Sequence, residues 1–122
     1  MELYNFSDMD LRIINNVINE FCNGLYIADL QSVLSCNSEK LEQILCIMDN
    51  AFNNMRFFKK WGCYDSTLES SLNRDQIKIV IKGLDEIFNY LNDGDIDTRI
   101  GYPPNALEKV KNKLNLLQNS PE

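Results

Sequence analysis

Apolar side chains recur at three- and four-residue steps in two long stretches of the chain. The first stretch contains Leu11, Ile14, Val17, Ile18, Phe21 and Leu25, and the second contains Ile77, Val80, Leu84, Ile87, Phe88 and Leu91. This spacing is typical of an amphipathic α-helix with one face turned toward a core. Asp8 and Asp10 supply capping and favourable charge at the start of the first stretch. The pattern therefore predicts two long helices.

The chain also aligns with itself without a gap when it is shifted by 66 positions, which places Leu11–Met48 over Ile77–Leu114. Identical residues recur along this overlap: Ile13 with Ile79, Glu20 with Glu86, Asn23 with Asn89, Leu25 with Leu91, Asp29 with Asp95, Leu41 with Leu107 and Glu42 with Glu108. We therefore predict an all-α fold that is a tandem duplication of a long helix–short helix–helix unit.

In each copy the long helix should lead through a short helix, opened by Asp29 or Asp95, into a third helix. The third helices should begin near Asn37-Ser38 and Pro103-Pro104, because asparagine and serine cap free N–H groups and proline suits a first helical turn. Further apolar positions follow at helical spacing: Leu41, Ile44, Leu45, Met48, Phe52 and Met55, then Leu107, Val110, Leu114 and Leu117. One repeat cannot bury these faces alone, so both should share a core.

The length of 122 residues suits one domain, residues 1–122, packed as a single helical bundle. We place the first repeat at about 8–58, a connector at about 59–73 and the second repeat at about 74–118. In the connector the helical pattern breaks, and Asp65-Ser66 can start a short helical turn.

The charge of the chain narrows the choice of partner. Twelve basic and eighteen acidic side chains leave a formal charge of −6, which disfavours binding to phosphate backbones and favours a basic partner. The stretch from Met55 to Trp61 interleaves aromatic and basic residues, as a nucleic-acid platform does, but Phe57, Phe58 and Trp61 can equally close one end of the core. We expect no direct nucleic-acid ligand.

The amino terminus has neither a basic start nor an apolar run, and no stretch approaches the roughly 18 apolar residues of a membrane span. We therefore expect a cytoplasmic protein that makes no membrane contact. Cys22, Cys36, Cys46 and Cys63 lack metal-ligand spacing, and the chain has no histidine, so reduced and mostly buried thiols are expected. No nucleophile elbow, P-loop or cofactor glycine motif is present either, so we expect neither an enzyme nor a cofactor.

Acidic residues gather around the predicted joint in the second copy. Asp93, Asp95 and Asp97 alternate as in a calcium loop, but counting from Asp93 the positions for glycine and glutamate hold Thr98 and Pro104. Gly101 can adopt a left-handed conformation that ends a helix, which makes the segment a joint between helices. The alternative is that it is also an interface. The candidate interface residues are Asp85, Glu86, Tyr90, Asp93, Asp95, Asp97 and Tyr102, with both tyrosines expected to be exposed.

Two blocks of the chain resemble small all-helical immunity proteins of contact-dependent growth inhibition and other polymorphic toxin systems. One block is Asn19-Glu20 with Cys22-Asn23-Gly24, and the other is Thr98-Arg99-Ile100-Gly101-Tyr102 followed by Leu107-Glu108. In that group both motifs typically occur within one unit, whereas here they are divided between the copies. We interpret them as fold determinants, with Asn23-Gly24 ending a helix and Arg99 satisfying nearby carbonyl groups.

The resemblance implies an immunity protein that binds a carboxy-terminal toxin domain, often a ribonuclease of the EndoU or RNase A-like kind. A ribonuclease cleft attracts phosphate and is usually basic, so an acidic helical protein can be steered onto it and block substrate entry. An alternative from another class is a non-enzymatic adaptor or regulatory protein whose helical groove accepts a partner helix.

Overall fold

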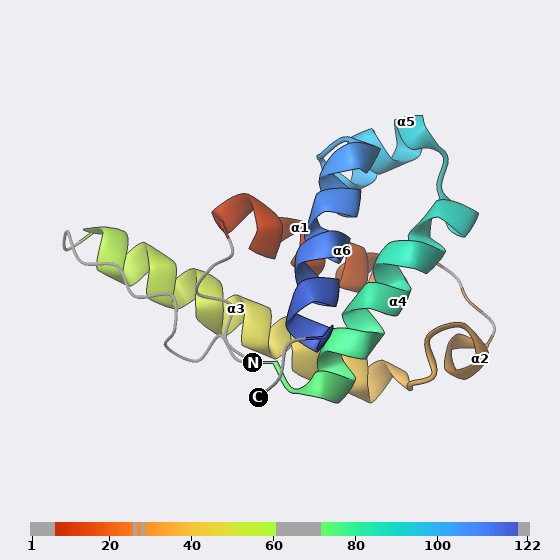
Figure 1. Cartoon of the computed structure of the whole chain (residues 1–122), viewed down its shortest axis with the longest axis horizontal. Helices are drawn as coiled ribbons and strands as arrows, with labels where there is room; N and C mark the ends of the chain where they lie inside the picture. The colour runs from red at the N-terminus through yellow and green to blue at the C-terminus, as the bar shows by residue number, and fades with distance from the viewer. Residues whose placement is uncertain (1–6, 26, 28, 61–71, 120–122) are drawn as a thin grey trace.

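The computed structural model describes residues 7–25, 27, 29–60 and 72–119, with side chains for all of these except 50–60 and 119. The α-helices are α1 (Asp8–Asn19), α2 (Leu30–Leu34), α3 (Ser38–Lys60), α4 (Arg74–Tyr90), α5 (Asp93–Asp95) and α6 (Pro104–Asn119) (Figure 1). Two π-helical segments, η1 (Glu20–Gly24) and η2 (Ile96–Ile100), continue α1 and α5. The described residues contain no β-strand, so the all-α prediction is confirmed.

Both long helices begin with a reciprocal cap. The Ser7 hydroxyl accepts a hydrogen bond from the Asp10 amide at 3.1 Å, and the Asp10 carboxylate accepts one from the Ser7 amide at 3.0 Å. Asn73 and Gln76 do the same at the start of α4, at 2.8 and 2.9 Å. The cap residue of α1 is thus Ser7, and Asp10 completes the capping box.

The third helices begin at the predicted positions. Asn37 caps α3 by accepting the Lys40 amide at 3.0 Å, and α6 begins at Pro104. In both copies the residue three positions before the first residue of the third helix has a left-handed backbone conformation: Ser35 has φ 58° and Gly101 has φ 90°. The left-handed Gly101 ends η2, so this part of the joint prediction is confirmed.

The bounds of the elements recur at the spacing found in the sequence. The helical stretch Asp8–Gly24 and α4 begin and end 66 residues apart, as do α2 and η2, while Ser38 and Pro104 start the third helices at that same spacing. Matching bounds fit a tandem duplication, which stays a prediction.

The apolar stripes meet in one core. Buried positions pair along the 66-residue spacing: Leu11 with Ile77, Ile13 with Ile79, Ile14 with Val80, Ile18 with Leu84, Leu34 with Ile100, Leu41 with Leu107, Ile44 with Val110 and Met48 with Leu114. Helices α1 and α4 pack closely where Val17 lies near Gly83, itself the counterpart of Val17. A Cβ atom built at Gly83 would lie 3.5–3.8 Å from Ile18, Val17 and Phe21, which is ordinary van der Waals contact, so a methyl group would fit there.

The short helical segments α2 and η2 each pack against the other half of the protein. Helix α2 packs against α4 and η2 packs against α1, so each short helix covers the long helix of the other half. The Asn16 side chain fixes one of these contacts by donating to the Ile100 carbonyl at 2.9 Å. Figure 1 shows α4 and α6 side by side, with α2 and α5 toward opposite ends of α4. This exchange makes the two halves one packed unit.

One predicted boundary is wrong. Asp29 does open α2, since it accepts the Ser32 amide at 3.2 Å, but its counterpart Asp95 precedes η2 without making a side-chain capping hydrogen bond. The chain becomes helical at Asp93, because the Asn92 side chain accepts the Asp95 amide at 2.8 Å and caps α5 instead.

Several expectations fall outside the described residues. These are the side chains of Phe52, Met55, Phe57, Phe58 and Trp61, the thiol of Cys63, and the turn at Asp65-Ser66. Of the expected connector, positions 59 and 60 still belong to α3, and α4 begins at Arg74. None of the helices in the described part of the chain has the length and apolar character needed to cross a membrane.

Candidate functional site

A contact between η1 and η2 joins the two sequence blocks that resemble immunity proteins. The guanidinium group of Arg99 binds the Glu20 carboxylate through two nitrogen atoms, at 3.1 Å and 2.6 Å. The same side chain donates to the Gly24 carbonyl at 3.2 Å, as expected for Arg99. Two planar groups matched in this way fix both distance and orientation, so the pair holds the two halves in register at this end.

Gly24 is required by that contact. A Cβ atom built at Gly24 would overlap the Glu20 carboxylate and lie 3.2 Å from the Arg99 guanidinium. The helical stretch ends at Gly24 and the chain is extended at Leu25, so the prediction that Asn23-Gly24 ends a helix is confirmed. The residues of both blocks thus act in the fold next to the second joint.

The acidic joint is formed by the end of α4, α5 and η2. Asp93, Asp95 and Asp97 are all exposed, and none of them forms an ion pair with another described residue. Between Gly83 and Thr98 the sequence contains acidic residues and no basic ones. The nearest arginine, Arg99, is neutralised by Glu20. These three aspartates therefore give this end of the molecule a negative potential that no cation on the same segment offsets.

The two predicted carboxylates on α4, Asp85 and Glu86, differ from the aspartates of the joint because each has a lysine partner. The Asp85 carboxylate accepts a hydrogen bond from Lys111 on α6 at 2.8 Å, and this bond is the main cause of the raised pKa of Lys111. Glu86 lies 3.8 Å from Lys82 and accepts a hydrogen bond from Asn89 at 2.9 Å. Both carboxylates are thus partly neutralised, so they add less to the acidic joint than Asp93, Asp95 and Asp97.

The two tyrosines differ in exposure. Tyr90 is 40% exposed and packs edge-on against Phe21, with ring centroids 5.8 Å apart. Tyr102 is only half-exposed and packs against the core, so the expectation that both are exposed is wrong for Tyr102. Of the two, Tyr90 is the better aromatic anchor for a partner.

Among the described cysteines, only Cys36 is buried; Cys22 is half-buried and Cys46 is exposed. The expectation of mostly buried thiols is therefore wrong for Cys46, which lies on the outer face of α3. All three are free thiols. Burial raises the pKa of both Cys22 and Cys36, which keeps them protonated at neutral pH. Within the described residues, no cluster of cysteine and carboxylate side chains could hold a metal ion.

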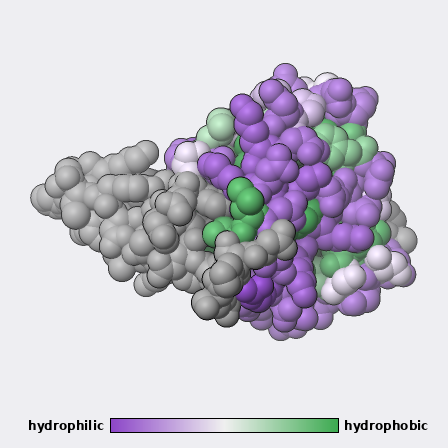
Figure 2. Space-filling view, viewed as in Figure 1, coloured by the Kyte–Doolittle hydropathy of each residue, from purple (hydrophilic) through white to green (hydrophobic). Residues whose placement is uncertain are grey.

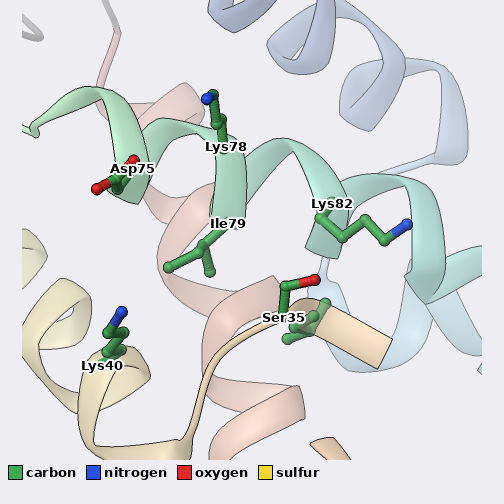
Figure 3. Close-up of a pocket in the computed structure, with 7 residues that line it drawn as sticks. Ser35, Lys40, Asp75, Lys78, Ile79 and Lys82 are labelled. Atoms are coloured by element: carbon green, nitrogen blue, oxygen red, sulfur yellow. The ribbon is translucent and has the colours of Figure 1, made fainter. Parts of the chain in front are cut away.

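The sequence reasoning missed a basic recess on the other side of the bundle. It has a volume of about 470 Å³ and lies between α4 and the turn from α2 to α3 (Figure 3). Its lining residues are Leu34, Ser35, Lys40, Asp75, Lys78, Ile79 and Lys82. The spacing of Lys78 and Lys82 does indicate that they share a helix face. Nothing in the sequence places Lys40 beside them, because that depends on how α3 meets α4.

Comparisons with family models, with curated proteins and with solved structures gave no match. The resemblance to immunity proteins is thus confined to the two sequence blocks, which lie in contact through Glu20 and Arg99.

Proposed function

We propose that this protein is an immunity protein that binds a cognate bacterial toxin domain, a ribonuclease, and neutralises it by covering its active site. The observation that carries the proposal is the acidic joint, where Asp93, Asp95 and Asp97 project from α5 and η2 without cations beside them. It needs neither a cofactor nor chemistry of its own.

Electrostatics supports this choice of partner. A ribonuclease must attract the phosphate groups of RNA, so its cleft carries a positive potential that complements an acidic surface. Complementary potentials speed up association and favour the correct orientation of the two proteins. Around α4, α5 and α6 the face shown in Figure 2 is mostly hydrophilic, which suits recognition by charge more than by a broad apolar patch.

The joint also has a rigid support. Arg99 ties η2 to η1 through Glu20 and Gly24, and Asn16 ties the end of η2 to α1. Ile96 and Ile100 on η2 are buried in the core. A surface held in place before binding loses little conformational freedom when the partner docks, which favours tight inhibition.

The test is a binding assay with the toxin domain encoded next to this gene. We expect Asp93, Asp95 and Asp97 changed together to lysine to slow association by about tenfold or more at low salt, because steering depends on these charges. The matched control changes three exposed acids of α3, Glu39, Glu42 and Asp49, to lysine.

Both triple variants alter the net charge equally, so general charge repulsion cannot distinguish them. The association rate of the control should fall less than that of the joint variant. Both variants should keep the helical circular dichroism of the parent. Equal losses would remove the acidic joint from the proposal. Failure of the parent protein to bind or protect against the neighbouring toxin would overturn the function itself.

The adaptor alternative has one structural observation in its favour. A recess of about 390 Å³ lies between η1, α2 and the start of α3, and about half of its lining is apolar. Phe21, Leu25 and Leu30 contribute to that lining. An apolar recess between helices can accept side chains of a partner helix. Recovery of a housekeeping protein in pull-downs, in place of a toxin, would favour this function.

A further inference from the structure

The basic recess continues along α4 as a groove. A second, smaller hollow of about 110 Å³ adjoins the first, and Lys40, Asp75 and Ile79 line both. Leu34 and Ile79 form the floor of the groove. Both expose little surface, since Ile79 is only 7% exposed and Leu34 is buried. The walls are polar side chains from α3 and α4. The groove therefore combines charged and hydrogen-bonding groups with a comparable apolar area.

The basic groups in the groove have few internal partners. Among the described residues, neither Lys40 nor Lys78 forms an ion pair, and Lys82 lies at 3.8 Å from Glu86. Asp75 is the one carboxylate in the lining of the larger hollow. Three lysines and a single carboxylate in the lining give this groove a positive potential on a chain whose net charge is −6.

The positions that correspond to these lysines carry different side chains. At positions 66 residues away, Lys40 corresponds to Ala106, Lys78 to Arg12 and Lys82 to Asn16. Arg12 is bound to Asp8 at 2.7 Å, and Asn16 donates to the Ile100 carbonyl. The gap between α1 and α6 is bridged by an ion pair between Lys113 and the buried Asp10. None of the three positions that correspond to these lysines thus holds a cation without an ion pair.

The arrangement of the lysines indicates the shape of a ligand. In Figure 3, Lys40 on α3 and Lys82 on α4 lie toward opposite ends of the recess, with Ile79 and Ser35 between them. The ammonium groups are spread out, so a single compact anion could not contact all of them at once. The volume of about 470 Å³ falls within the range of small-molecule sites, roughly 300–1,000 Å³.

We propose that this groove binds a small, elongated polyanion whose phosphate or carboxylate groups are separated along its length. Lys40 and Lys82 bind the two ends, Lys78 neutralises charge between them, and the Ser35 hydroxyl donates a hydrogen bond. Lysine suits this role because its ammonium group is a compact charge on a flexible stem. The site lies apart from the acidic joint, and the proposal does not depend on toxin binding.

Titration calorimetry on the full chain tests the site with three probes at fixed ionic strength: tripolyphosphate, citrate and inorganic phosphate. We expect at least one elongated probe, tripolyphosphate or citrate, to bind more tightly than inorganic phosphate because it spans the lysines. Binding of tripolyphosphate alone identifies a phosphate site, and binding of citrate alone identifies a carboxylate site. Binding of both identifies a general polyanion site. Amide shifts measured by NMR should map to Ser35, Lys40 and residues 78–82.

Lys40 and Lys82 changed together to methionine keep the length of the side chains but remove both end charges. This variant should weaken binding of the preferred probe by about tenfold or more, since two charge-assisted contacts are lost. The matched control changes Arg12 and Lys109 to methionine, which alters net charge equally outside the groove. Thermal unfolding verifies that both variants are folded.

Two results would overturn the proposal. One is the absence of binding by tripolyphosphate and citrate, or binding no tighter than that of inorganic phosphate. The other is an equal loss of affinity in the groove variant and the control, which would show that net charge alone attracts the probe.

Discussion

The two halves of this protein place their helices alike and their charges differently. Between α1 and α6, Lys113 binds the buried carboxylate of Asp10 and closes the surface. Between α3 and α4, the corresponding region is an open groove rimmed by Lys40, Lys78 and Lys82. Apolar positions set the arrangement that both halves share, while a few polar exchanges decide which of these two junctions between the halves is bridged and which is open.

The acidic joint shows the same contrast at the short helices. In the first half Asp29 caps α2, and its carboxylate is engaged by Ser32. In the second half Asn92 takes over the capping, which leaves the carboxylate of Asp95 exposed on α5. A change of capping residue thus converts a structural carboxylate into a surface charge. Both proposed sites arise where one half departs from the other.

The largest expected effect comes from the shared core. Leu41 and Leu107 are the same residue at corresponding positions, and both are fully buried. Changing either to alanine should lower the free energy of unfolding by about 2–5 kcal/mol, because a buried methyl-bearing side chain is replaced by a cavity. Urea denaturation followed by circular dichroism measures both. A loss below about 1 kcal/mol at one site only would show that the halves do not contribute alike to the core.

A smaller effect is expected from the ion pair between Lys113 and Asp10, which bridges α6 and α1. Changing Lys113 to methionine leaves the buried carboxylate of Asp10 without its cation, which should cost about 1–3 kcal/mol of unfolding free energy. Changing the exposed Lys109 to methionine is the control and should alter stability by less than about 0.5 kcal/mol. If both variants unfold at the same urea concentration, the ion pair between Lys113 and Asp10 does not add to the stability of the junction between α1 and α6.

The smallest expected effect separates Asp29 from Asp95. Changing Asp29 to alanine removes the cap of α2 and should lower the melting temperature at neutral pH, whereas changing Asp95 to alanine leaves the Asn92 cap in place. The hydrogen bonds from Ser32 hold the pKa of Asp29 below its ordinary 3.8. Its stabilisation is therefore present above pH 3.8 and is lost as the pH falls through the lower folded pKa.

Thermal unfolding between pH 2 and pH 7 checks this result. The difference between the parent and the Asp29 variant should shrink toward the acid end of the range, while the Asp95 variant should follow the parent throughout. A constant difference at every pH would mean that the Asp29 carboxylate does not act through its charge.

Much of the fold could be predicted because helical spacing and capping residues are local signals. The stripe from Leu11 to Leu25 and the breaks at Gly24 and Gly101 lie where the structure places them. The start of α5 was missed because Asn92 and Asp95 are both good caps, and local sequence does not decide between them. The half-burial of Tyr102 was missed because it depends on how η2 packs against α1.

The candidate sites divide in the same way. The acidity of the joint could be predicted, since Asp93, Asp95 and Asp97 are neighbours in the chain. The neutralisation of Asp85 by Lys111 could not, because 26 residues separate the two and only the packing of α4 against α6 joins them. The contact of Glu20 with Arg99 spans 79 residues and depends on the exchange of short helices between the halves.

The sequence by itself determined where the helices lie, which faces are apolar and how the order of elements repeats, because these follow from interactions within a few residues along the chain. The tertiary structure alone decided which charges meet. Ion pairs and grooves depend on distances of a few ångströms between helices, and these distances are set by the packing of the whole core.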